Sequence, residues 1–162
     1  MRQRRPRLPA TAYREGLACL LTLCTAGRRR FFEDPGLVAL VWAQILRAAG
    51  KERISIPAYC FMPDHLHMVV ERGSDQADVA RFVQLAKQLS GYYFRQLTGT
   101  MLWQPSWHDR VLRRSDDVLV AIRYVVGNPV RAGLVNDVAE YPFLGSGTIS
   151  RDALMASIGT QA

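Results

Sequence analysis

The sequence predicts one α+β domain in which helices cover one face of an antiparallel β-sheet. The chain has 162 residues, 49% of them hydrophobic, which suffices for a globular domain with its own core. Apolar runs follow the order strand, helix, strand, strand, helix, strand, and an extra helix comes after them. This order is the split β-α-β layout called ferredoxin-like, and it leaves the second face of the sheet free for a ligand.

The first third of the chain contains a basic arm, a strand and a helix. Residues 1–12 are rich in arginine and proline, and we expect them to form a flexible arm. Residues 17–25 form a short apolar run that is typical of a buried strand. Asp34 followed by proline predicts the capped start of a helix over residues 34–49, and Gly50 predicts its end.

The middle third predicts a hairpin and the second helix. Residues 53–61 and 65–71 have the composition of strands, and the Pro-Asp pair at 63–64 predicts a tight turn between them. Apolar residues at helical spacing then predict a long helix over residues 77–97, which Gly99 should end.

The last third predicts a short strand over residues 109–113 and a further helix. A Ser-Asp-Asp triplet indicates the capped start of this helix over residues 115–124. The Asn-Pro pair at 128–129 should break it, because proline lacks the amide donor that a helix needs. After the arm, we therefore divide the chain into a domain over residues 13–135 and a weakly structured tail over residues 136–162.

The chain is basic, and arginine supplies almost all of the positive charge. The 21 Lys and Arg residues exceed the 14 Asp and Glu residues by seven, and 19 of the 21 are Arg. The planar guanidinium binds phosphate with two hydrogen bonds and stacks on bases. A polyanionic partner, most often nucleic acid, is therefore indicated. A GC-rich genome with many arginine codons would give the same composition.

The cysteines argue against a framework of disulfides or zinc, and the short apolar run near the start argues against a membrane span. Cys19, Cys24 and Cys60 are odd in number and form no C-x-x-C pair, so we expect reduced thiols in a cytosolic protein. The basic start of the chain and the apolar run after it imitate a signal peptide. Arg14 and Glu15 adjoin a run of only about ten apolar residues, however, which is too short to span a membrane.

Two histidines lie on alternate positions of the predicted third strand. Because side chains alternate across a strand, His65 and His67 should emerge on one face while Leu66, Met68 and Val70 fill the core on the other. The imidazoles would then lie roughly 6–7 Å apart at Cβ, close enough to share a divalent ion. The alternative is a chance H-x-H pattern in which one histidine bonds a backbone carbonyl.

A second group of polar residues follows the fourth strand. Tyr124 and Asn128 are four residues apart, which would place them on one face of a helix. Asn128 precedes proline, however, and this pair is equally typical of a helix start in which asparagine is the cap. Both roles are compatible, since a carboxamide oxygen has two lone pairs.

Three motifs resemble one protein family. They are AYCFMPDHLHMVVE at 58–71, WQPSWHDRVLR at 103–113 and YVVGNPVRAGLV at 124–135. In this order and spacing they resemble the REP-associated tyrosine transposases, within the single-tyrosine HUH superfamily, where HUH denotes histidine, a hydrophobic residue and histidine. The resemblance covers residues 13–135.

The resemblance implies a reaction and a set of site residues. Tyr124 would be the nucleophile, and a divalent ion, Mg²⁺ or Mn²⁺, would be held by His65, His67 and Asn128. A phenol is a poor nucleophile at neutral pH, and a metal that polarises a phosphate oxygen would offset the developing charge. The implied product is a 5′-phosphotyrosine with a free 3′-OH. The ester keeps the bond energy for religation, which agrees with the absence of a Gly-rich phosphate loop.

Other residues are assigned to DNA contact or to structure. Asp64 is expected to form the turn, not to bind metal, and His108 to lie on the surface. Trp103 and Trp107 are expected to pack, with base stacking as the alternative. The arginines expected to bind DNA are those of the arm and Arg28, Arg29, Arg30, Arg110, Arg113, Arg114, Arg123 and Arg131.

We therefore expect a metal-dependent single-stranded DNA endonuclease and strand transferase that cuts next to hairpin-forming palindromic repeats. It would act at the bacterial nucleoid in the cytoplasm, as a monomer or a homodimer. One alternative is a non-catalytic hairpin-binding protein derived from a transposase, although the retained histidines and tyrosine disfavour it. Another is a small metal hydrolase that uses the H-x-H pair and Asp64. The sequence leaves open the target repeat and the source of the tyrosine, from the same chain or a partner.

Overall fold

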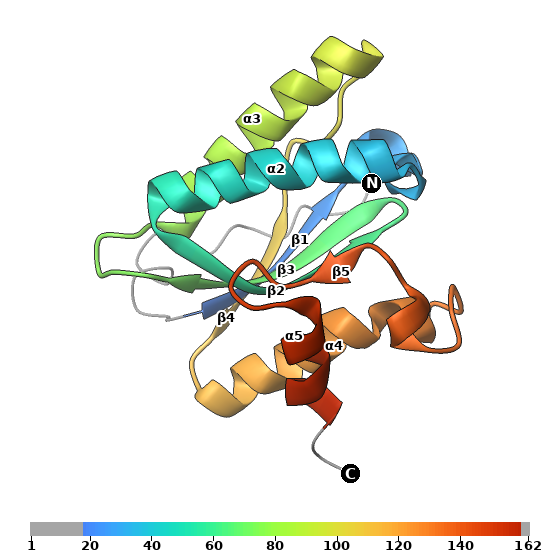
Figure 1. Cartoon of the computed structure of the whole chain (residues 1–162). Helices are drawn as coiled ribbons and strands as arrows, with labels where there is room; N and C mark the ends of the chain where they lie inside the picture. The colour runs from blue at the N-terminus through green and yellow to red at the C-terminus, as the bar shows by residue number, and fades with distance from the viewer. Residues whose placement is uncertain (1–17, 160–162) are drawn as a thin grey trace, which may run out of the picture.

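The computed structural model describes residues 18–159, in which five strands form one antiparallel sheet of order β4-β1-β3-β2-β5 (Figure 1). The first four strands in this order match the ferredoxin-like layout, so the predicted fold class is confirmed. The strands are β1 (Ala18–Cys24), β2 (Ile54–Met62), β3 (His65–Arg72), β4 (His108–Leu112) and β5 (Leu144–Gly145). The helices are α2 (Pro35–Glu52), α3 (Val79–Thr98), α4 (Ser115–Arg131) and α5 (Arg151–Gly159), with short 3-10 turns η1 (Ala26–Arg28), η2 (Phe31–Glu33) and η3 (Val138–Glu140).

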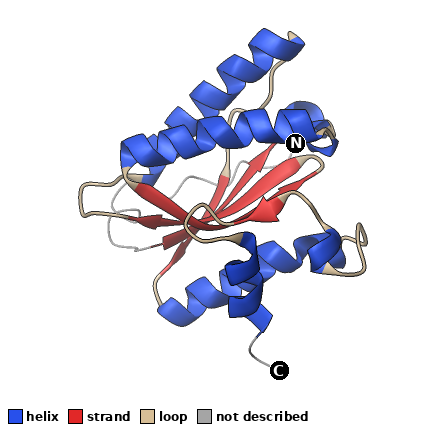
Figure 2. Ribbon diagram, viewed as in Figure 1, coloured by secondary structure: helices blue, strands red, loops and turns tan. Residues whose placement is uncertain are grey.

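Helices lie on both faces of the sheet (Figure 2). Helices α2 and α3 cover one face, where the large core forms, and α4 and α5 lie on the other. The second face was expected to be free, and this expectation is wrong. Ala121, Val125 and Val126 of α4 are fully buried and belong to a smaller core with Ala58 and Val69 of the sheet. The apolar stripe of α4 is therefore buried against this face of the sheet, where it is removed from water.

The ends of α2 and α3 follow their caps. The Asp34 carboxylate accepts hydrogen bonds from the amides of Gly36 and Leu37, as predicted for the start of α2. The expected end at Gly50 is wrong, because the backbone becomes left-handed only at Arg53, with φ of 56°. Helix α3 ends as predicted at Gly99, with φ of 74°.

Helix α4 differs from its prediction at both ends. It runs through Pro129 to Arg131, so the predicted break at 128–129 is wrong. Proline removes one amide donor, but Pro129 is buried. The Ala132 amide still donates a hydrogen bond to the Asn128 carbonyl. The helix begins after Arg114 without a side-chain cap, and two aspartates in its first turn face the positive end of the helix dipole.

The segment after residue 135 is ordered, in contrast to the expected weakly structured tail. It contributes η3, β5 and α5, and β5 pairs with β2. The Tyr141 hydroxyl donates to the Phe61 carbonyl, and Arg151 donates to the Leu144 carbonyl at 3.0 Å. Leu144 and Leu154 are also buried in the smaller core, so this segment is held by packing although its sequence lacks a clear hydrophobic period. The predicted arm, residues 1–12, lies outside the described residues.

The three cysteines agree with the expected reduced state. Cys19, Cys24 and Cys60 are buried free thiols. No helix within residues 18–159 is both long and apolar enough to cross a bilayer.

Candidate active site

The register of β1 and β3 sets the positions of both histidines. Thr22 pairs with His67 and Cys24 pairs with His65. As predicted from strand alternation, Leu66, Met68 and Val70 belong to the core under α2 and α3. The histidines consequently emerge on the other face, which α4 shares.

The two imidazoles turn the same ring atom toward each other. The Nε2 atoms of His65 and His67 are 3.2 Å apart. The Nδ1 atom of His65 lies 2.7 Å from a carboxylate oxygen of Asp64, and the Nδ1 atom of His67 lies 2.9 Å from the Thr22 hydroxyl. Metal-binding histidines are usually oriented by such partners on the second ring nitrogen. The pair thus offers two oriented Nε2 donors to a single point.

Burial keeps both imidazoles in the form that can bind a metal. Burial, together with the charge that His65 carries once it is protonated and the charge of Arg131, lowers the pKa of His67 to about 3. Burial also lowers the pKa of His65, against the opposing effect of Asp64. Both rings are therefore neutral near pH 7, and a neutral ring has a lone pair for a metal ion.

Asp64 is held as an orienting group. It also accepts a hydrogen bond of 2.9 Å from the Arg28 guanidinium. Burial raises the pKa of Asp64, but the hydrogen bond with His65 and the Arg28 charge outweigh burial and leave the pKa below its usual value. Arg28 donates in addition to the Cys24 sulfur at 2.8 Å. Asp64 thus carries the negative charge that fixes His65, and this role disfavours the hydrolase in which it would be a ligand.

Tyr124 reaches the histidines from α4 of the same chain. Its ring centroid lies 5.7 Å from that of His67, at an interplanar angle of 70°. The side chain is 44% exposed, so solvent or a substrate can reach it. The tyrosine and the histidine pair therefore form one site within a single chain.

Arg131 folds back along α4 onto Tyr124. Its guanidinium donates to the Tyr124 carbonyl, and the central guanidinium carbon lies 4.3 Å from the centre of the tyrosine ring. Gly127 lies between them, and a Cβ atom there would come within 2.9 Å of Arg131 Nη1. The absence of a side chain at Gly127 therefore leaves space for the Arg131 side chain. Sequence reasoning missed this role, although glycine inside a helix costs about 1 kcal/mol relative to alanine and was a usable signal.

Asn128 lies inside α4, one turn after Tyr124, so its predicted alternative role as a helix cap is wrong. Its carboxamide is partly exposed and has no hydrogen-bond partner among the described residues. Within residues 18–159, no three His, Cys, Asp or Glu side chains are grouped to hold a metal. The two imidazoles are suitable donors for a divalent ion, and the Asn128 carboxamide, solvent or phosphate would supply its remaining ligands.

The predicted DNA-binding arginines are distributed over several elements. Arg28 contacts Asp64, and Arg131 contacts Tyr124. Arg110 pairs with Leu20 on β1, which by alternation places it on the histidine face at the sheet edge. The other predicted arginines lie on three further parts of the chain. They are Arg29 and Arg30 around η1 and η2, Arg113 and Arg114 before α4, and Arg123 on α4.

Comparison with known proteins places this geometry in context. The model of the family described as IS200-like transposases matches residues 15–126. A REP-associated tyrosine transposase of Escherichia coli (strain K12) is 27% identical over 102 residues, which are 61% of this chain and 58% of that protein. The match thus spans little more than half the length of this curated relative.

Two solved structures share the fold. A REP-associated tyrosine transposase bound to a REP hairpin has a TM-score of 0.71 at 20% identity, over 89% of this chain and 82% of that one. A candidate transposase from Deinococcus radiodurans R1 has a TM-score of 0.53 at 18% identity, over 74% of this chain and 92% of that one. At these identities the likeness establishes the fold alone.

Proposed function

The chain belongs to the IS200-like transposase family, and on that premise we propose that it is a single-stranded DNA endonuclease and strand transferase that acts through a 5′-phosphotyrosine. The resemblance to REP-associated tyrosine transposases is confirmed, because a curated relative and a solved structure carry that name. The activity and the substrate remain our proposal.

One observation carries the proposal. Two neutral imidazoles with facing Nε2 atoms and a partly exposed tyrosine come together from two elements that are far apart in the sequence. A packing role would not require both Nε2 atoms of His65 and His67 to face each other, nor the Tyr124 ring to lie beside them. This constellation supports a nucleophile next to a site for a phosphate and its metal ion.

The chemistry follows from the groups that meet there. The Tyr124 oxygen attacks phosphorus and gives its proton to solvent, while the bond from phosphorus to the 3′ oxygen breaks and that oxygen takes up a proton. His65 and His67 would hold Mg²⁺ or Mn²⁺, which would offset the negative charge that develops on a non-bridging phosphate oxygen. Arg131 keeps a fixed positive charge beside the nucleophile. A second 3′-OH can reverse the step, which joins a new strand without a nucleotide triphosphate.

We propose hairpin DNA with a single-stranded flank as the substrate. The net charge of +7 favours a polyanion, and one similar protein has been solved bound to a REP hairpin. Since one chain holds the complete set of His65, His67 and Tyr124, a monomer would suffice for cleavage.

The test uses hairpin-forming oligonucleotides with a single-stranded flank, labelled at either end, with Mn²⁺ and a denaturing gel. The fragment with the new 5′ end should shift with the protein, and the other should carry a free 3′-OH. Tyr124→Phe should abolish the shift, whereas Tyr93→Phe, an exposed tyrosine on α3, should not. A shift of the opposite fragment, or one that survives Tyr124→Phe, would contradict the proposal. Binding without cleavage would favour the non-catalytic alternative.

A further inference from the structure

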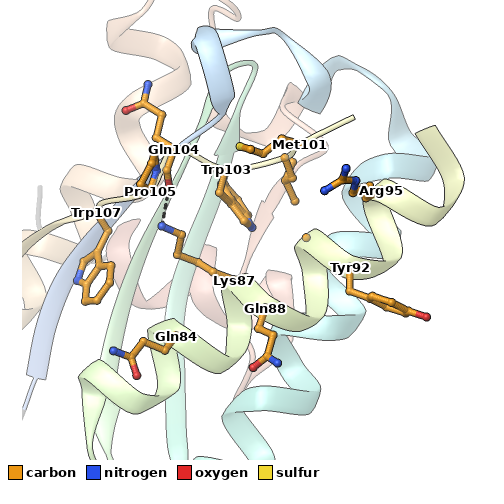
Figure 3. A pocket seen from close by; sticks show the side chains of 12 residues that line it. Gln84, Lys87, Gln88, Tyr92, Arg95, Met101, Trp103, Gln104, Pro105 and Trp107 are labelled. Atoms are coloured by element: carbon orange, nitrogen blue, oxygen red, sulfur yellow. Dashed lines mark hydrogen bonds between the residues drawn. The ribbon is translucent and has the colours of Figure 1, made fainter. Parts of the chain in front are cut away.

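A groove of about 570 Å³ lies between α3 and the segment that leads to β4, outside the candidate active site (Figure 3). Trp107 lies at one end, Trp103 near the middle, and Tyr92 and Arg95 at the other end. Lys87 rises from α3 to the facing segment. Nothing in the proposed cleavage reaction uses these residues.

Hydrogen bonds fix both walls of the groove. The Trp103 indole nitrogen donates to the buried Ser90 hydroxyl at 2.9 Å. The Lys87 ammonium donates to the carbonyls of Gln104 and Ser106 at 2.7 Å and 3.3 Å, and it lies 5.5 Å from the centre of the Trp107 ring. Trp103 and Trp107 are buried and belong to the large core, as the expected packing role predicts, so they form a fixed floor under the groove.

Gly91 keeps the groove open. It lies inside the 20-residue helix α3, where glycine is less favourable than almost any other residue. A Cβ atom at this position would meet only Trp103 Cδ1, at 3.9 Å, which is ordinary van der Waals contact. The fold therefore does not require glycine here, and a larger side chain would project over Trp103 into the open space. The glycine is explained if the space itself is needed.

The lining chemistry suits single-stranded DNA. Two cations line the groove, and none of the described lining residues is Asp or Glu. Tyr92 is 59% exposed and presents a ring on which a base can stack. The lining glutamines offer donors and acceptors for base edges, and the cations suit the phosphates between the bases. A ligand with acidic groups alone would use only the cations, and a purely apolar ligand would use only the aromatic residues.

The groove leads toward the candidate active site. Met101, which is 61% exposed, lines both this groove and a second hollow with Ala26, Gly27 and Arg29. Arg28, the neighbour of Arg29, donates to Asp64, which in turn contacts His65. The groove lies on the side of the sheet that α2 and α3 cover, so a strand would pass along Met101 and Arg29 and around the turn at Asp64 to reach the histidine pair on the other face.

We infer that this groove binds the unpaired nucleotides that flank the cleaved phosphodiester, with a base stacked on Tyr92 and phosphates near Lys87 and Arg95. The inference rests on the proposed function for its choice of ligand. It extends that function by assigning a binding site for the single strand that is separate from the residues of the reaction.

The test measures binding of oligothymidylate by a Tyr124→Phe protein, in which no cleavage takes place. Two of the three tryptophans line the groove, and Trp42 stacks on Tyr59 elsewhere. Oligothymidylate should therefore quench tryptophan fluorescence. An added Gly91→Leu should fill the groove, abolish the quenching and weaken binding about tenfold, the effect expected for the loss of one or two stacked bases.

A second variant of the groove and a change outside it complete the test. Tyr92→Ala with Arg95→Ser should weaken oligothymidylate binding several-fold, and it decides the question if Gly91→Leu fails to fold by circular dichroism. Arg81→Ser, at an exposed position of α3 outside the lining, should have no effect. Equal quenching and affinity in the groove variants would overturn the inference, as would capture of peptides but not oligothymidylate.

The outcome is independent of the proposed cleavage. If the groove assignment fails, a hairpin without a flank and the Tyr124 adduct of the wild-type chain are unaffected. If the cleavage proposal fails, the adduct is missing while Gly91→Leu still reduces oligothymidylate binding.

Discussion

Acidification should destabilise the protein through His67. The imidazole is 8% exposed, and burial, with the charges of His65 and Arg131, lowers its pKa from 6.5 to about 3. The unfolded chain takes up a proton at this position below about pH 6.5, whereas the folded chain does so only near pH 3. Between these values the unfolded state binds more protons, so the free energy of unfolding falls as the pH falls.

The size of the effect follows from the width of this window. Each pH unit within it costs about 1.4 kcal/mol for one proton, so acidification from about pH 7 to about pH 4.5 should remove about 3 kcal/mol. Urea unfolding in EDTA at these two pH values measures the loss. Over the same pH change, the free energy of unfolding of His67→Gln should fall by about 3 kcal/mol less than that of the wild-type chain, because the carboxylates titrate alike in both proteins.

His108→Gln provides the control for loss of a histidine. His108 lies exposed at the start of β4, so this change removes a histidine without altering the core. If His67→Gln loses as much free energy of unfolding as the wild-type chain, the buried neutral state of His67 is refuted.

Three further predictions concern the site and the fold. Arg131→Gln should slow adduct formation by roughly tenfold or more on the denaturing gel, because the fixed positive charge beside the tyrosine is lost. EDTA should stop adduct formation and Mn²⁺ restore it on the same gel, since the charge that develops on the phosphate then lacks the metal ion that would offset it. Cleavage at full rate in EDTA would refute the metal role. Tyr141→Phe should lower the free energy of unfolding by about 1–2 kcal/mol in urea, because a buried carbonyl of β2 loses its donor, whereas Tyr93→Phe should not.

The sequence predicted those features that depend on local patterns. Strand alternation was enough to place His65 and His67 on one face, because the opposite residues are apolar without exception. The Asp34 cap and the left-handed Gly99 were predicted for the same reason, since each depends on a few neighbouring residues. The spacing of Tyr124 after the fourth strand was read from the family resemblance.

Features that depend on tertiary packing could not be predicted. Pro129 looked like a helix break, but burial against the sheet side of α4 compensates for one missing donor. The two-residue strand β5 has no pattern of its own and forms because β2 offers an open edge. The Gly127 gap and the facing Nε2 atoms likewise exist only after α4 and the sheet have come together.

The central claim, that Tyr124 becomes covalently joined to DNA, can be tested most directly by mass spectrometry of the trapped adduct. Trypsin cuts after Arg123 and Arg131, so Tyr124 is the single tyrosine of the peptide YVVGNPVR. After nuclease digestion, this peptide should carry a nucleotide joined through its 5′ phosphate to the tyrosine. An unmodified YVVGNPVR peptide, with the nucleotide on another peptide of the chain, would contradict the account.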